Sequence, residues 1–146
     1  MFLGTYSPKL DEKGRLFLPA KFREALADGV VVTRQQDRCL AIYPLETFRQ
    51  MTVASMKAPS TFKRVRDYQR MLAASASDEV PDKQGRITIP PRLRDYAGLD
   101  KELVLVGSID RLEVWDPAAW DAYSAQNEDA FAEMNEDPFL GFDQHD

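Results

Sequence analysis

The sequence is poor in the side chains that carry most enzyme and metal chemistry. It contains one cysteine, Cys39, and one histidine, His145, among 146 residues. A single cysteine excludes an intramolecular disulfide and suits a reducing compartment, and we expect it to be buried in a strand. His145 is the penultimate residue, where no packed neighbourhood would orient it as a base. Because zinc-ligand spacing and glycine-rich phosphate loops are also missing, we predict no catalytic residue, no metal and no cofactor.

Long apolar runs are missing as well. No stretch reaches the roughly 18 to 20 apolar residues that span a bilayer. Residues 1–15 lack the basic start and long apolar run of a signal peptide. We therefore expect a cytoplasmic protein without a membrane partner. The length suits one ordinary domain or two very small ones.

Basic side chains are absent from the C-terminal part of the chain. Residues 112–146 contain ten carboxylates and no Lys or Arg, whereas residues 1–111 contain 19 basic and 14 acidic side chains. The net charge of −5 is therefore the sum of a body at +5 and a tail at −10. Such asymmetry is common in unrelated proteins, but it leaves a polyanion such as DNA open as a partner.

The sequence does contain an internal repeat. DEKGRLFLPAKFR at residues 11–23 returns as DKQGRITIPPRLR at residues 82–94, an offset of 71. Asp, Gly, Arg, Pro and the final Arg coincide, and the apolar residues between them alternate as in a strand. The similarity continues, with residues 30–38 beside 103–111 and residues 40–48 beside 112–120. We conclude that the chain is a tandem duplication.

Each copy predicts the same order of elements. An extended stretch leads into a glycine turn, where glycine supplies a positive φ and the aspartate can accept backbone N–H groups. A strand at residues 15–18 or 86–89 follows, and proline then begins a short helix. The helix of the second copy is expected to end at Gly98. Two further strands complete each copy, at residues 30–33 and 40–43 or 103–106 and 112–115.

Helices are predicted between and after the copies. Residues 44–57 and 60–74 form two of them, with Ser60 as the N-cap of the second. A third begins at Pro117 after an Asp116 cap. Beyond about residue 126 the acidic tail lacks periodicity, and we expect it to be loosely ordered or to dock on a partner through its aromatic residues.

A copy with four short strands buries too little apolar surface to be stable alone and leaves open sheet edges. We therefore predict a mainly β fold with helices, of the α+β class. The two copies form one pseudo-two-fold β-barrel, with helices after each copy. The predicted segments are residues 1–60 for the first repeat, 61–74 for a connecting helix, 75–125 for the second repeat and 126–146 for the acidic tail.

The arginine after each glycine turn is the candidate functional group. Arg15 would lie at the tip of a two-stranded hairpin, which can enter the major groove and present two hydrogen bonds to guanine. Lys13 would then contact phosphate. The other candidates are Gly14, Lys21 and Arg23 in the first copy and Lys83 and Arg86 in the second, with Arg92 and Arg94 nearby. A purely structural role stays open, in which Asp11 and Asp82 pair with the arginines and fix the turns. The basic stretch 63–70 is a second candidate surface, although we favour a solvated helix face there.

These motifs resemble those of the MraZ family of bacterial transcriptional regulators. The resemblance rests on DEKGR and DKQGR, each followed by a strand and by Leu-Pro or Ile-Pro, and it covers about residues 1–125. It implies an AbrB-like swapped-hairpin fold, in which two short copies interlock into one barrel. It carries the family motif onto Asp11, Arg15, Asp82 and Arg86.

The same resemblance implies a nucleoid-associated DNA-binding regulator encoded with division and cell-wall genes. Such proteins assemble into homo-oligomeric rings and bind direct repeats in the promoter upstream of their own operon. We favour the first turn as the principal reader, because Lys13 lies beside Gly14 and Arg15. The alternative is a protein-interaction ring that uses the acidic, aromatic tail to bind a partner protein.

Overall fold

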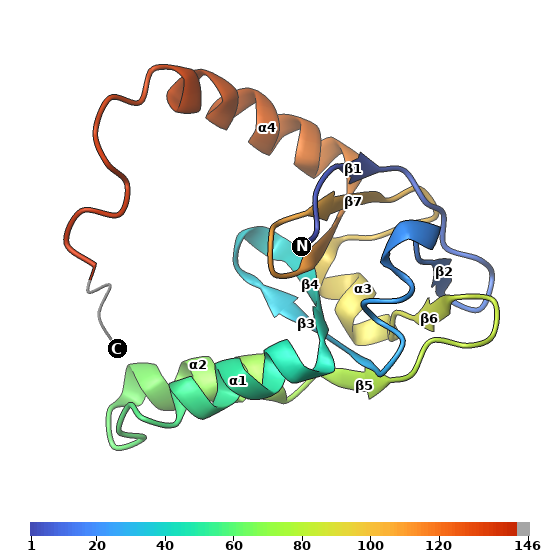
Figure 1. Cartoon of the computed structure of the whole chain (residues 1–146), viewed down its shortest axis with the longest axis horizontal. Helices are drawn as coiled ribbons and strands as arrows, with labels where there is room; N and C mark the ends of the chain where they lie inside the picture. The colour runs from blue at the N-terminus through green and yellow to red at the C-terminus, as the bar shows by residue number, and fades with distance from the viewer. Residues whose placement is uncertain (143–146) are drawn as a thin grey trace.

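The computed structural model describes residues 1–142, so His145 and the last four residues of the tail lie outside the described part. Residues 1–142 form eight strands, four α-helices and two short 3-10 helices (Figure 1). The strands are β1 (Thr5–Tyr6), β2 (Arg15–Phe17), β3 (Val30–Gln35), β4 (Cys39–Pro44), β5 (Ser77–Glu79), β6 (Arg86–Thr88), β7 (Val104–Gly107) and β8 (Leu112–Trp115). The helices are η1 (Ala20–Phe22), η2 (Gln36–Arg38), α1 (Leu45–Ser55), α2 (Lys63–Ala73), α3 (Pro91–Ala97) and α4 (Pro117–Ala132). The predicted α+β class is confirmed.

The strand pairs of residues 1–142 are antiparallel, and four of the six pairs join one repeat to the other. Six strands form a sheet in the order β1-β7-β8-β4-β3-β5, and β2 pairs with β6 in a separate two-stranded ribbon. The partner of β1 is β7, and the equivalent partner of β5 is β3. Exchanging the two repeats therefore reproduces the same set of pairs, so neither repeat completes its sheet without the other.

This pairing corrects one expectation. The strands before and after each glycine turn were predicted to form a hairpin, yet β1 pairs with β7 and β2 with β6. Only the turn itself is closed, by the hydrogen bond from the Asp11 amide to the Arg15 carbonyl at 2.9 Å and by its counterpart at Asp82. The strand β2 pairs instead with its equivalent in the other repeat, which places Leu16 opposite Ile87 at the centre of the ribbon.

The core lies between the ribbon and the six-stranded sheet. The alternate residues of the ribbon strands are buried, as the sequence predicts. They pack with apolar side chains of β3, β4, β7 and β8 in one cluster. The inward residues of the ribbon and its ends are Leu16, Leu18, Ile87 and Ile89.

The helices agree with the sequence in part. Asp116 caps α4 by accepting the Ala119 amide at 3.0 Å, and Gly98 ends α3 in the left-handed conformation, both as predicted. Ser60 is not an N-cap, because α2 begins at Lys63 without a side-chain cap. Helix α4 continues through Ala132, beyond the expected start of an irregular tail. It buries no residue, and a helix without a buried face leaves no apolar periodicity in the sequence.

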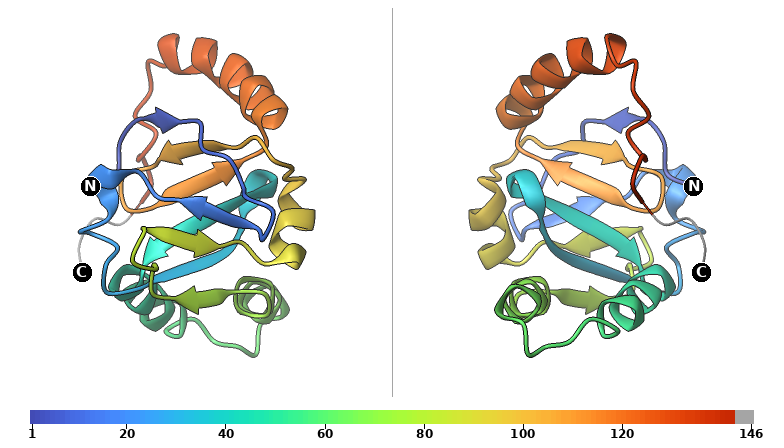
Figure 2. Two further views of the ribbon diagram at one scale, coloured as in Figure 1. Left: turned by 90° about the vertical axis from the view of Figure 1, so that its right-hand side faces the viewer. Right: turned by 90° about the vertical axis from the view of Figure 1, so that its left-hand side faces the viewer.

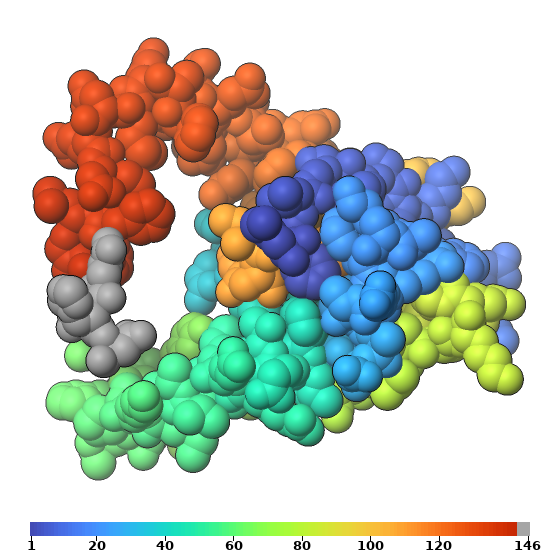
Figure 3. Space-filling view, in the orientation of Figure 1, coloured from blue at the N-terminus to red at the C-terminus, as the bar shows by residue number. Residues whose placement is uncertain are grey.

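The two glycine turns and the outer helices lie on opposite sides of the molecule. In Figure 1, the ribbon of β2 and β6 lies on the right, whereas α4 and the α1–α2 pair extend to the left. The space-filling view shows open space between α4 and the α1–α2 pair (Figure 3). No described helix has the length and apolar character needed to cross a membrane.

Candidate nucleic-acid interface

The first turn is held together by one carboxylate. Asp11 Oδ1 accepts the backbone amides of Lys13 and Arg15, both at 2.9 Å. Its Oδ2 accepts the guanidinium Nε of Arg15 at 2.8 Å. Gly14 has φ of 74°, a value that suits glycine, and its amide donates to the Asp11 carbonyl at 3.0 Å. One side chain thus fixes both the turn and the pose of its arginine.

The second turn repeats this geometry atom for atom. Asp82 Oδ1 accepts the amides of Gln84 and Arg86, and Oδ2 accepts Arg86 Nε at 2.7 Å. Gly85 has φ of 76°. The sequence leaves a structural and a DNA-reading role open for these ion pairs. The structure shows that the pairs exist, and it shows that each uses only Nε of the guanidinium among residues 1–142.

The hydrogen bonds of the turns favour the charged carboxylates. The amide of Arg15, followed by its side chain and by the Lys13 amide, lowers the pKa of Asp11 against a smaller opposing effect of burial. The amide of Arg86 lowers the pKa of Asp82 in the same way. Both carboxylates are therefore ionised at neutral pH, with the arginines held beside them.

We expect the turns to lose their stabilising effect in acid. Because the folded pKa values lie below the unfolded value of about 3.9, this stability is complete above about pH 4 and is lost as pH falls through the lowered values. The variant Asp11→Asn/Asp82→Asn should have a lower free energy of unfolding than the wild type at pH 7. This difference should become smaller toward pH 3. Urea unfolding at both pH values measures the difference. Burial and the charge of Asp82 raise the pKa of Glu79, so the titration of Glu79 also changes in the double variant, and Asp11→Asn alone isolates the contribution of the first turn. A difference in unfolding free energy that stays constant with pH would contradict a stabilising role of the ionised aspartates.

Each glycine turn is covered by an arginine from the opposite repeat. A Cβ at Gly14 would lie 3.1 Å from Cζ of Arg94, and a Cβ at Gly85 would lie 2.8 Å from Cδ of Arg23. Arg23 also donates from Nε to the Leu18 carbonyl at 3.2 Å. The sequence places Arg23 at the start of the helix after the first turn, and the structure adds that its side chain packs against the second turn. The interlocked pairing of the repeats is the cause.

We expect Gly85→Ala to destabilise the protein by about 2–3 kcal/mol, since alanine both disfavours positive φ and displaces Arg23. Gly98→Ala is the matched control, because Gly98 has φ of 63° and no atom within 4 Å of a Cβ. It should cost only the backbone term of about 1–2 kcal/mol. Urea unfolding of both variants gives the comparison. Equal costs would show that Arg23 does not pack on the turn.

The remaining candidates occupy distinct places. Lys13 and Lys83 are exposed on their turns. Lys21 lies on η1 with its ammonium 5.6 Å from the ring centre of Tyr6 and 5.4 Å from that of Phe22.

The two turns also differ in their surroundings. Arg86 lies 5.7 Å from the ring centre of Phe17, whereas Arg15 faces Thr88 in the ribbon register. The first turn carries Glu12 where the second carries Lys83, so the second turn is the more basic.

Arg94 is the residue whose place sequence reasoning missed. It was noted only as a basic residue near the second turn, yet its guanidinium lies against the first. The position of Arg94 could have been inferred from the sequence, because Arg94 is equivalent to Arg23 at the 71-residue offset and the two repeats interlock.

Comparison with known proteins decides the family. The family model described as "MraZ protein, putative antitoxin-like" matches residues 1–71 and again residues 72–141. A transcriptional regulator MraZ of Cutibacterium acnes is 66% identical over 92% of this chain and 94% of its own length. Those of Thermobifida fusca and Paenarthrobacter aurescens are each 54% identical over 97% of this chain and 99% of their own. The chain belongs to the MraZ family.

The MraZ matches agree with the duplication read from the sequence. Their common boundary falls within α2, between the repeats, and the second match extends past residue 125 into the acidic segment. The MraZ family consists of transcriptional regulators, not enzymes. Cys39 is buried in β4 as predicted, and burial raises the pKa of its thiol.

Proposed function

We propose that this chain is a DNA-binding transcriptional regulator that reads DNA with the β2–β6 ribbon and its two turns. The observation that carries the proposal is the duplicated geometry, in which each arginine is held through Nε by an aspartate four residues earlier. The relatives named transcriptional regulators support the same conclusion.

The aspartates prepare the arginines for base recognition. An ion pair through Nε leaves the two terminal amines of each guanidinium for guanine O6 and N7, and it removes much of the entropy cost of ordering the side chain. The exposed Lys13 and Lys83 then contact phosphates, and Lys21 and Arg23 add positive charge. We propose that the first turn is the principal reader. The more basic second turn is the alternative, and the two are compared by mutation of their arginines.

We also propose that the sheet and ribbon close into one swapped-hairpin barrel of pseudo-two-fold symmetry. Residues 1–60 and 75–125 are its two halves, residues 61–74 connect them, and residues 126–146 form the acidic tail. The symmetric pairing between repeats supports this division. In such a barrel the two turns occupy related positions on one face.

We propose that the chain acts as a ring-shaped homo-oligomer, since one ribbon offers few contacts to DNA. Several copies on direct repeats would combine modest affinities through their effective concentration. We propose the promoter upstream of the chain's own operon, within the division and cell-wall gene cluster, as the site.

Footprinting on that upstream DNA tests the function, with the mass of the free protein measured in parallel. We expect regularly spaced protection that weakens steeply as salt rises, since phosphate contacts release counterions. Protection that is uniform along any DNA would contradict sequence-specific regulation.

A second candidate function is the capture of a partner protein by the tail. It is favoured by the exposed Phe131, Phe139 and Phe142 among carboxylates. Deletion of the residues from Gln126 onward, which removes all three phenylalanines, should then lose the partner and retain DNA binding by the ribbon. A truncated chain that still binds the partner would contradict this role.

A further inference from the structure

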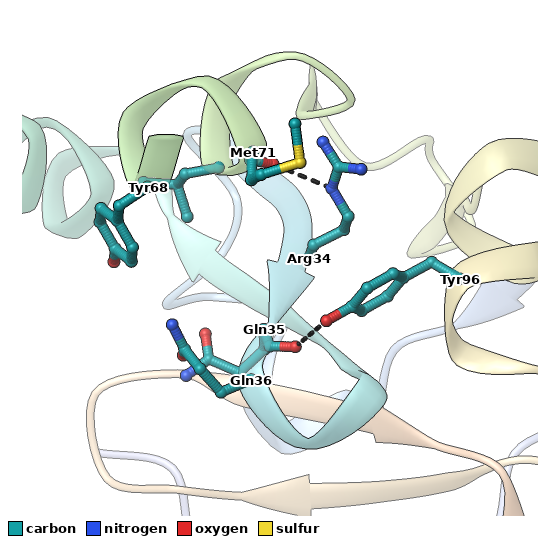
Figure 4. A pocket seen from close by; sticks show the side chains of 7 residues that line it. Arg34, Gln35, Gln36, Tyr68, Met71 and Tyr96 are labelled. Atoms are coloured by element: carbon teal, nitrogen blue, oxygen red, sulfur yellow. Dashed lines mark hydrogen bonds between the residues drawn. The ribbon is translucent and has the colours of Figure 1, made fainter. Parts of the chain in front are cut away.

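A hollow separates α2 from α3 beside the end of β3. It has a volume of about 160 Å³ and is lined by Arg34, Tyr68, Met71 and Tyr96, among others (Figure 4). Two hydrogen bonds fix its walls. Arg34 Nε donates to the Met71 carbonyl at 2.9 Å, and the Tyr96 hydroxyl donates to the Gln35 carbonyl at 2.7 Å.

The hollow combines exposed apolar walls with positive charge. Met71 and Tyr68 are 55% and 44% exposed. The guanidinium carbons of Arg34 and Arg38 lie 5.9 Å and 5.0 Å from the centre of the Tyr96 ring. Within residues 1–142 neither arginine forms a salt bridge. The surface therefore fits a short apolar segment flanked by carboxylates.

The chain contains such a segment after α4. Glu136 and Asp137 precede Phe139 by two or three residues, and Phe139 and Leu140 are 63% and 81% exposed. Asp137 Oδ1 accepts the Phe139 amide at 2.9 Å, which keeps acidic and aromatic groups in one compact turn. Residues 126–142 carry five carboxylates and no basic residue.

The occupant comes from another molecule. The described chain after α4 descends on the side of α1, whereas α2 and α3, whose residues line the hollow, lie on the other side (Figure 2, right). We propose that residues 136–142 of one copy dock in the α2–α3 hollow of a second copy. The carboxylates of Glu136 and Asp137 pair with Arg34 and Arg38, while Phe139 enters between the walls. Such a contact is head-to-tail, so an open chain of copies keeps one free tail and one free hollow at its two ends until a ring closes. This inference rests on the proposed homo-oligomer, and its tests measure assembly without DNA.

Cross-linking between two variants of different chain length tests it. Met71→Cys in one chain and Phe139→Cys in the other should give a disulfide-linked heterodimer, because the native Cys39 is buried. The matched control replaces Met71→Cys by Val53→Cys, an exposed position on α1. A heterodimer yield no higher than the control overturns the proposal. So does a double variant, Met71→Cys/Phe139→Cys, that links only within one chain.

Charge reversal supplies a second measurement. Arg34→Glu/Arg38→Glu should weaken self-association by about tenfold to a hundredfold in sedimentation, since two charge-assisted contacts become repulsive. Adding Glu136→Arg/Asp137→Arg should restore assembly, which simple damage to the hollow would not allow. Assembly that is unchanged by the first pair, or not restored by the second, overturns the docking. A footprint that survives such a result leaves the proposed DNA-binding function standing.

Discussion

Arg15→Ala and Arg86→Ala should each lower the affinity for specific DNA by about 10- to 100-fold, which corresponds to the loss of one bidentate contact to guanine. Non-specific binding should change much less, because it depends on the summed phosphate contacts. Titration of labelled operator and scrambled DNA over a salt series separates the two components.

The control variants distinguish recognition from charge and from folding. Arg49→Ala removes one positive charge from α1, where the side chain is exposed beside Glu46, and should leave specific affinity within about twofold. Arg15→Lys keeps the charge but loses both the Nε bond to Asp11 and the bidentate geometry. It should therefore behave like alanine on specific DNA and like the wild type on scrambled DNA.

The effects of Arg15→Ala and Arg86→Ala on the affinity for specific DNA show which turn contacts the bases. If the first turn is the principal reader, Arg15→Ala has the larger effect. A larger effect of Arg86→Ala would favour the more basic turn, whose arginine also packs on Phe17. If both variants bind operator as tightly as the wild type, the ion pairs of the turns serve only the fold.

Local features of the turns could be predicted from the sequence because they are encoded within five residues. Asp at the first position, Gly at the fourth and Arg at the fifth determine the backbone bonds, the positive φ and the ion pair together. The duplication strengthened the prediction of the turn structure, since two copies of one motif are expected to adopt the same structure. The aspartate–arginine contacts are accordingly the same in both to within 0.1 Å.

The long-range features could not be predicted in the same way. The strand β1 has two residues, and nothing in Thr5 or Tyr6 distinguishes β7 from β2 as its partner. The positions of Arg23 and Arg94 depend on that choice, so they were missed together. The α2–α3 hollow likewise joins residues more than 50 positions apart, such as Arg34 and Tyr96, which no local pattern connects.

The interlocked pairing has a measurable consequence for folding. Leu16 and Ile87 are directly opposite in the ribbon, and both are almost completely buried. Leu16→Ala and Ile87→Ala should each destabilise the protein by about 2–4 kcal/mol, because a cavity forms where the two repeats meet. Thr88→Ala, an exposed position in the same ribbon, is the control and should stay within about 0.5 kcal/mol.

Two spectroscopic probes show whether the repeats unfold together. Both tryptophans, Trp115 and Trp120, belong to the second repeat, whereas circular dichroism reports on the whole chain. Because the ribbon joins the repeats, Leu16→Ala in the first repeat should shift the tryptophan transition by the same denaturant concentration as the dichroism transition. A tryptophan transition that stays at the wild-type midpoint would mean that the second repeat folds by itself. The pairing of β2 with β6 would then contribute little to the stability of the fold.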